Sequence, residues 1–218
     1  MQNKQPLWLD VSLWSANLLN LESDIRAMEP YADGFHIDVA DGHFVPTLLF
    51  FPDLVAAIRK ATTKPLHVHL MATEPAELAP SFIEAGADII TVPVEIATAS
   101  KAVAAINAAG RKAGLAVSLD TDVEALGSLF DGISVVVAMG TRVGIKGVDL
   151  APEACDRIRA IRKLLDQRGL DIRVYADGGI REHTVPLLQA AGADGIVPGS
   201  LLFNASDRGR VHAWLKSL

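Results

Sequence analysis

Apolar and polar positions follow one another along the chain in short, nearly continuous apolar runs separated by longer periodic stretches. The runs contain little alternation, which is typical of strands buried on both faces of a parallel sheet. Eight of them are found, at residues 7–13, 34–39, 65–71, 88–93, 114–119, 133–139, 172–176 and 194–198. The stretches between them repeat apolar residues with helical spacing, for example at 51–61, 75–86, 98–110, 152–168 and 181–192.

The regular succession of these elements predicts the fold. Several helical stretches have Pro near the start and Gly just past the end, as helices prefer. Eight strand–helix units in 218 residues are typical of an α/β protein with a single (β/α)8 TIM barrel, here spanning 1–218. The segment EAGADIITV at 84–92 recurs as QAAGADGIV at 189–197, half a barrel apart. An open, doubly wound sheet is the competing interpretation.

Composition and charge exclude several classes of function. The net charge is −6 with no dense basic cluster, so we expect no nucleic-acid partner. Cys155 is the sole cysteine, which rules out a disulfide within the chain and fits a reducing compartment. Asp10 interrupts the first apolar run, and no run approaches 18 apolar residues, so neither a signal peptide nor a membrane span is expected. We expect a cytoplasmic protein.

Imidazoles and carboxylates occur where the predicted strands end. His36 and Asp38 lie two residues apart in one strand and therefore share a face. Together with His69 and Asp177, from two other strands, they can converge at the carboxyl end of a barrel, where catalytic residues gather. Two His and two Asp are a plausible ligand set for one divalent metal ion. The alternative is that the imidazoles are hydrogen-bonded core groups and the carboxylates cap helices.

Glycine-rich segments follow the last two predicted strands. The sequences DGGI (177–180) and PGSLLF (198–203) stand where barrels commonly bind a phosphate through backbone N–H groups. Ordinary tight turns are the alternative interpretation. In the loop GTRVGIKG (140–147), Arg142 and Lys146 could add positive charge, although solvated loop cations are more common.

At these residues the chain resembles the ribulose-phosphate 3-epimerase family of (β/α)8 barrels. The resemblance rests on VSLWSANLLNL, HIDVADGHFVP, HVHLMATEP, EAGADIITV, DGGI and AGADGIVPGSLLF, in that order. It implies a metal site of His36, Asp38, His69 and Asp177, in which Asp38 and Asp177 are also the catalytic acid and base. It further implies substrate or phosphate contacts from Ser12, Met71, Gly144, Gly178, Gly179, Gly199 and Ser200.

The chemistry of epimerisation agrees with this resemblance. Inverting the carbon beside a ketone requires one group to remove a proton from one face and another to return a proton to the opposite face. A divalent ion, which could be Zn, Fe, Co or Mn, would stabilise the enediolate between these steps. We therefore predict a metal-dependent 3-epimerase of a ketose phosphate with one divalent ion per chain. The resemblance also implies a homo-oligomer.

Several positions depart from the family pattern, and they concern the pocket wall rather than the proposed chemistry. They are Ala40, Thr47, Pro93, Ser118 with Leu119, and the loop 140–148. Because the small Ala40 could enlarge the pocket, the departures favour the same reaction on a different substrate, such as allulose 6-phosphate or a tetrulose phosphate. The remaining alternative is a barrel that binds a sugar phosphate without turnover. His67 is expected to be a buried histidine beneath the site.

Overall fold

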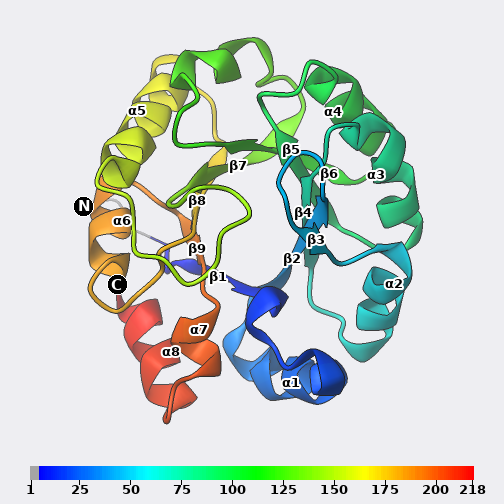
Figure 1. Cartoon of the computed structure of the whole chain (residues 1–218). Coiled ribbons are helices and arrows are strands. Elements are labelled where there is room, and N and C mark those ends of the chain that lie inside the picture. Colours follow the sequence, from blue (N-terminus) through cyan, green and yellow to red (C-terminus); the bar gives the residue numbers. More distant parts are fainter. Residues whose placement is uncertain (1–4) are drawn as a thin grey trace.

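The computed structural model describes residues 5–218 and contains a closed parallel barrel ringed by helices (Figure 1). Its first strand pairs with both the second and the last barrel strand, so the open-sheet alternative is wrong. The barrel strands are β1 (Trp8–Ser12), β2 (Gly34–Asp41), β4 (Leu66–Met71), β5 (Ile89–Pro93), β6 (Lys112–Val117), β7 (Ile133–Met139), β8 (Arg173–Asp177) and β9 (Gly195–Val197). The eight predicted strands are all found, with ends that differ by at most two residues.

The helices form the outer ring, and their ends follow the local chemistry of the chain. Pro52 and Pro75 open their helices at a position that needs no backbone N–H, and Gly192 ends another with a left-handed φ of 111°. The helices are α1 (Leu21–Met28), α2 (Pro52–Ala61), α3 (Pro75–Glu84), α4 (Ala99–Ala108), α5 (Ala154–Gln167), α6 (Val185–Ala191), α7 (Ser200–Phe203) and α8 (Arg208–Ser217). Short 3-10 segments lie at η1 (Leu13–Ser15), η2 (Leu18–Asn20), η3 (Glu29–Tyr31) and η4 (Val123–Ser128).

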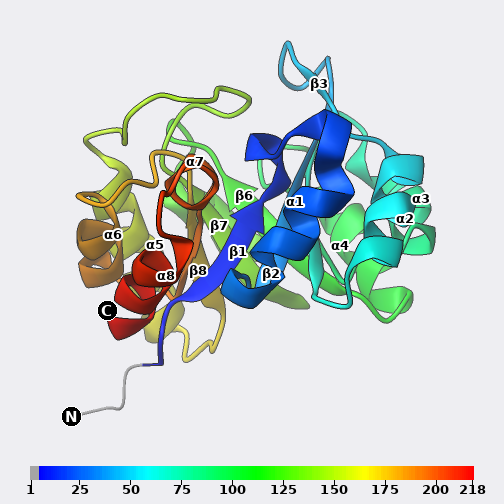
Figure 2. The ribbon, with the colours of Figure 1, turned by 90° about the horizontal axis from the view of Figure 1, so that it is seen from below.

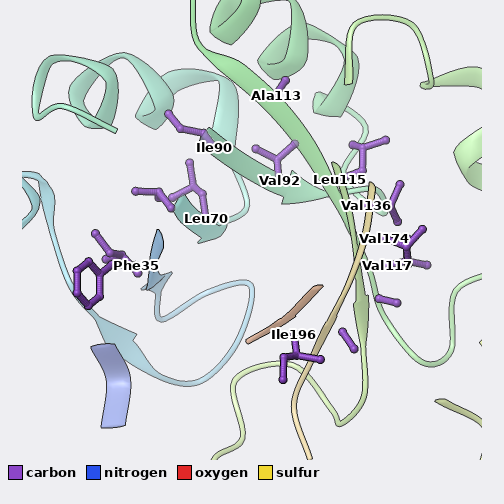
Figure 3. Close-up of a cluster of buried hydrophobic side chains, with 14 of the residues drawn as sticks. Phe35, Leu70, Ile90, Val92, Ala113, Leu115, Val117, Val136, Val174 and Ile196 are labelled. Atoms are coloured by element: carbon purple, nitrogen blue, oxygen red, sulfur yellow. The ribbon is translucent and has the colours of Figure 1, made fainter. Parts of the chain in front are cut away.

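The main hydrophobic core lies between the barrel and the helices. Outward-facing strand residues such as Phe35, Leu70, Ile90 and Val174 are fully buried there (Figure 3). Because side chains alternate along a strand, their neighbours point into the barrel. That interior is divided: β6, β7 and β8 contribute an apolar half that includes Val137, whereas β1, β2, β4 and β5 contribute a polar half.

Two segments rise from the carboxyl end of the barrel (Figure 2). One leads from β2 to the short strand β3 (Leu48–Leu49), which pairs antiparallel with β2 and was not predicted. The other is the loop 140–153 after β7. Lys146 Nζ donates to the Trp14 carbonyl at 2.6 Å, and Thr47 Oγ1 donates to the Gly144 carbonyl at 3.3 Å, so this loop is tied to the segments that follow β1 and β2. Within residues 5–218, no helix combines the length and the apolar character needed to cross a bilayer.

Candidate active site

The carboxyl ends of three strands bring two histidines and two aspartates together. β2 carries His36 and Asp38, β4 carries His69 in register with Asp38, and β8 ends at Asp177. The first three are buried, with relative exposures of 0%, 5% and 1%, and Asp177 is partly buried. They face inward because Phe35, Ile37 and Val39 occupy the opposite face of β2 in the core.

The spacing of these groups fits a metal ion. His36 Nε2 lies 3.4 Å from Asp38 Oδ1 and 3.5 Å from Asp177 Oδ2. His69 Nδ1 lies 3.6 Å and 3.5 Å from the same two oxygens. Ligands held about 2.1 Å from a tetrahedral ion lie about 3.4 Å from one another. The four ligand atoms are all within 4.8 Å of one another, so they can surround one ion.

The two imidazole nitrogens that point into this cluster, His36 Nε2 and His69 Nδ1, are buried and have no hydrogen-bond partner among the described residues. A buried polar atom without a partner costs about 1–3 kcal/mol. A bound ion would remove that cost, because a neutral imidazole nitrogen is a common metal ligand. The residues therefore fit a divalent cation by geometry, by donor type and by their unmet bonding capacity.

The charges of the cluster reinforce one another. Burial alone would raise the pKa of Asp38, but His36 and His69 beside it hold that pKa well below its ordinary value. Burial alone would lower the pKa of His36 and of His69. For His36 the nearby Asp38 outweighs burial, and for His69 the adjacent carboxylates of Asp177 and Asp38 do, so both pKa values are raised. Protons and a metal cation thus compete for the same nitrogens.

Ser12, at the end of β1, holds the other side of Asp38. Its hydroxyl donates to Asp38 Oδ2 at 3.0 Å, while Asp38 Oδ1 faces the two imidazoles. The two oxygens of this carboxylate therefore have separate environments. One oxygen can bind an ion held by the cluster, while the other remains beside Ser12 at the cavity. Ser12 and Asp38 both line that cavity.

The cluster opens into a cavity of about 140 Å³ at the carboxyl end of the barrel. Asp38, His69 and Asp177 line it, whereas the fully buried His36 is not among its lining residues. The other predicted contact residues all line the same cavity, namely Ser12, Met71, Gly144, Gly178, Gly179, Gly199 and Ser200.

The glycines at the cavity have a structural reason that is independent of any ligand. Gly178 and Gly179 have φ values of 94° and 68°, in the left-handed region. A Cβ at Gly178 would lie 2.4 Å from Thr141 Oγ1, and a Cβ at Gly199 would lie 2.4 Å from Ser15 Oγ. The left-handed φ of Gly178 and Gly179 fits the tight-turn interpretation, whereas at Gly199 the close approach of Ser15 is what requires glycine. All three residues also line the cavity.

Some features of the cavity are not evident from the sequence. Trp14, whose residue type suggests core packing, instead lines the cavity, and so does Arg181, which directly follows DGGI. In the sequence, a cationic side chain directly after a glycine-rich segment is the signal that could have identified Arg181 as a cavity residue. Ala40 does not widen the cavity, because it is 4% exposed and packs against Val45 and Met71. The expectation of extra space at Ala40 is wrong.

This fold and site define a class: a parallel (β/α)8 barrel whose His and Asp side chains meet at the carboxyl ends of its strands. A sequence model of the ribulose-phosphate 3 epimerase family matches residues 8–203, and the chain belongs to that family. It is therefore an isomerase and belongs to the epimerases that act on carbohydrates.

Individual relatives agree with the family. The chain is 36% identical to ribulose-phosphate 3-epimerase of Bacillus subtilis, over 90% of this chain and 92% of the relative. It is 38% identical to the enzyme of the same name from Synechocystis, over 89% and 86% of the two chains. The corresponding Escherichia coli protein is 34% identical, over 92% and 90%.

Solved structures of more distant proteins share the fold. One is a 3-keto-L-gulonate-6-phosphate decarboxylase from Vibrio cholerae, with a TM-score of 0.70 and 20% identity over 98% of this chain and 96% of that one. Another is a 3-hexulose-6-phosphate synthase from Salmonella typhimurium, with a TM-score of 0.63 and 18% identity over 98% and 97%. These identities establish the barrel and no particular reaction.

Proposed function

We propose that this isomerase is a metal-dependent 3-epimerase of a ketose phosphate and that ribulose 5-phosphate is its first candidate substrate. The observation that carries the proposal is the pair of carboxylates at one cavity. Asp38 Oδ1 and Asp177 Oδ2, from β2 and β8, lie 3.4 Å and 3.5 Å from the same imidazole nitrogen, His36 Nε2. The curated relatives named ribulose-phosphate 3-epimerase support the choice of substrate.

Asp38 and Asp177 are proposed to serve opposite faces of the reacting carbon. One carboxylate removes the C3 proton, and the other, protonated, returns a proton to the other face. In the reverse direction they exchange roles, so each must alternate between base and acid. Asp38 and Asp177 both line the cavity, so substrate bound there would contact both carboxylates.

His36, Asp38, His69 and Asp177 would hold the divalent ion. When bound, such an ion stabilises the negative charge that develops on the substrate oxygens as the proton leaves. The donor set of two imidazoles and two carboxylates suits Zn, Fe, Co or Mn. The side chains of the site would hold the substrate carbon between the two carboxylates and transfer the proton.

The glycine-rich part of the cavity is proposed to hold the phosphate. Gly178, Gly179, Gly199 and Ser200 bring backbone to one side of it, where N–H groups can hydrogen-bond to phosphate oxygens. The cations Arg142, Lys146 and Arg181 also line the cavity and complement a dianion. This charge arrangement favours a phosphorylated sugar over a neutral one.

The loop 140–148 supports a second candidate substrate. This segment departs from the family pattern, yet it contributes Arg142, Gly144 and Lys146 to the cavity lining. A different lining can select a different ketose phosphate, such as allulose 6-phosphate or a tetrulose phosphate, for the same chemistry. Binding without turnover is disfavoured, because a binding protein has no need of two carboxylates beside the same imidazole.

Proton exchange at C3 tests the mechanism. In deuterated water, Asp38→Asn and Asp177→Asn should each lower net epimerisation by about 10²–10⁴-fold. Each variant that retains metal should still exchange the C3 proton of the one epimer that its remaining carboxylate can reach. Metal content is measured in parallel, because both residues are also proposed ligands. Equal loss of exchange for both epimers in each metal-replete variant would contradict the two-carboxylate mechanism.

A substrate panel tests the specificity. Ribulose 5-phosphate, allulose 6-phosphate, a tetrulose phosphate and unphosphorylated ribulose are compared by kcat/KM. We expect every phosphorylated sugar that reacts to be preferred over the neutral one. Preference for unphosphorylated ribulose would contradict the phosphate site, and absence of C3 exchange with all of them would favour binding without turnover.

A further inference from the structure

A second polar cluster lies directly beneath the proposed metal site, inside the barrel. It consists of Asp10 on β1, His67 on β4 and Thr91 on β5, with relative exposures of 1%, 0% and 0%. None of these residues lines the cavity, so none touches substrate there. Buried charged and polar groups are costly unless they are bonded, and such a cluster in a barrel interior calls for a physical explanation.

The cluster is connected to the site through one shared oxygen. Asp10 Oδ2 lies 2.6 Å from His67 Nδ1 and 3.3 Å from His36 Nδ1. His67 Nε2 lies 2.6 Å from Thr91 Oγ1. The separation of 2.6 Å is the length of a short hydrogen bond and is well below the roughly 3.4 Å between ligands of one tetrahedral ion. We therefore interpret Asp10, His36 and His67 as hydrogen-bonded rather than as a second metal site.

Each proton in this network has one consistent position. Both imidazole Nδ1 atoms approach the same oxygen, Asp10 Oδ2, within hydrogen-bond distance, and a carboxylate oxygen that faces two ring nitrogens acts as the acceptor for both. Both Nδ1 atoms must therefore carry hydrogen and donate to Asp10. A neutral His67 then has an unprotonated Nε2, which accepts from the Thr91 hydroxyl.

Neighbouring glycines make room for the network. A Cβ at Gly34 would lie 2.9 Å from Asp10 Oδ1, and a Cβ at Gly114 would lie 2.4 Å from Thr91 Oγ1. The ring of His67 packs edge-to-face against that of His36, with centroids 4.9 Å apart. The network is thus enclosed on several sides, and it can hold the His36 ring in one orientation.

We propose that Asp10, supported by His67 and Thr91, is a positioning residue that fixes His36 as its Nδ1–H tautomer and directs Nε2 toward the metal. This inference rests on the metal site of the proposed function. A hydrogen bond of this kind also raises the basicity of the ligating nitrogen. The other imidazole is arranged differently, since His69 presents Nδ1 to the cluster and its Nε2 is buried without a hydrogen-bond partner among the described residues.

Metal affinity of the full chain is the first test, with Zn²⁺ as the probe and a chromophoric chelator as competitor. In Asp10→Asn the amide keeps the size of the carboxylate but cannot accept from both imidazoles through one ionised oxygen. We expect Zn²⁺ affinity to fall by about 10–100-fold, as is typical for the loss of such a supporting group. Unchanged affinity in a folded Asp10→Asn protein would overturn the proposal.

Val68→Ala is the matched control. Val68 is fully buried on β4 between His67 and His69, but its side chain faces the helices rather than the barrel interior. The substitution should destabilise the same strand, as large-to-small core changes do, while Zn²⁺ affinity stays within about twofold of wild type. A loss of affinity equal to that of Asp10→Asn would reduce Asp10 to a structural role.

Histidine side-chain NMR gives a second readout that needs no variant to fold. In Zn²⁺-loaded wild type, ¹H–¹⁵N spectra should show a slowly exchanging Nδ1–H on His36 and another on His67. A His36 that carries its proton on Nε2 would overturn the proposal even if Asp10→Asn fails to fold. If wild type binds no divalent ion, the proposed metal dependence fails, whereas the spectrum of the metal-free protein still tests the network separately.

Discussion

The carboxylate of Asp38 has two oxygens in different environments. Oδ2 accepts a hydrogen bond from Ser12 at 3.0 Å, and Oδ1 lies near His36 Nε2 and His69 Nδ1. A hydrogen bond to an ionised group stabilises the charged form and is worth about 1.5–3 kcal/mol. Ser12 is therefore expected to lower the basicity of Asp38 and to fix the plane of its carboxylate.

Removal of that hydroxyl provides a test at the residue scale. In Ser12→Ala, we expect kcat to fall on the order of tenfold, because Asp38, the carboxylate proposed to transfer the proton, loses its support on one side. The pKa of Asp38 should rise, so the acid limb of the pH–rate profile should move to higher pH. Metal content should stay at the wild-type level, since the four proposed ligands are intact. A profile that does not move would contradict this role of Ser12.

At the scale of elements, a single side chain joins the end of β2 to the loop after β4. Asp41 accepts hydrogen bonds from the backbone N–H groups of His43, Phe44 and Thr73, each at 2.8 Å, and from Thr73 Oγ1 at 3.0 Å. Its slight burial would raise its pKa, but the bonds from Thr73, Phe44 and His43 outweigh this and lower the pKa to about 2.

This turn makes a contribution to stability that depends on pH. A depressed folded pKa means that the contribution is present above the unfolded value of 3.8 and is lost as pH falls toward 2. At pH 7, Asp41→Ala should lower the free energy of unfolding by about 1 kcal/mol, a modest value because the site is partly exposed. Urea unfolding of both proteins at pH 7, 4 and 2.5 measures the difference. A difference that is the same at all three would contradict the assignment.

At the scale of the whole molecule, the barrel interior is built in two unlike halves. The side formed by β6, β7 and β8 is filled by packed apolar side chains such as Val137 and by Tyr175. The side formed by β1, β2, β4 and β5 contains the buried polar groups, two of which point unpartnered nitrogens at the proposed metal site. Stability and metal binding should therefore be linked.

Metal addition should stabilise the folded chain. A ligand at 100 times its dissociation constant adds about 2.7 kcal/mol to the free energy of unfolding. For a chain of this size each kcal/mol raises Tm by about 2–4 °C, so a rise of about 5–10 °C is expected. Calorimetry with and without Zn²⁺ or Mn²⁺ measures it, and His69→Ala is the control that should lose the shift. An equal shift in that variant would place the ion elsewhere.

The expected homo-oligomer and cytoplasmic location stay predictions.

Local pattern alone determined much of this protein. Nearly continuous apolar runs are sufficient to indicate buried parallel strands, so all eight were predicted in order, including 133–139 to the residue. Alternation along one strand is likewise sufficient to place His36 and Asp38 on the same face. The short strand β3 and the 3-10 segment η4 were not predicted; β3 has two residues and forms only by pairing with the end of β2.

Tertiary structure decided which side chains are neighbours in space. In the sequence, Asp10 is only an interruption of an apolar run, because nothing in its neighbourhood along the chain reveals His67, 57 residues away. Their contact exists because closure of the barrel and the registers of β1, β2 and β4 bring the two side chains within hydrogen-bond distance inside it. In the same way, the packing of loops over the barrel mouth decided that Trp14 and Arg181 line the cavity and that Ala40 does not. Sequence periodicity determines which face a side chain takes, whereas its partner on that face depends on strand register and closure, which are properties of the assembled sheet.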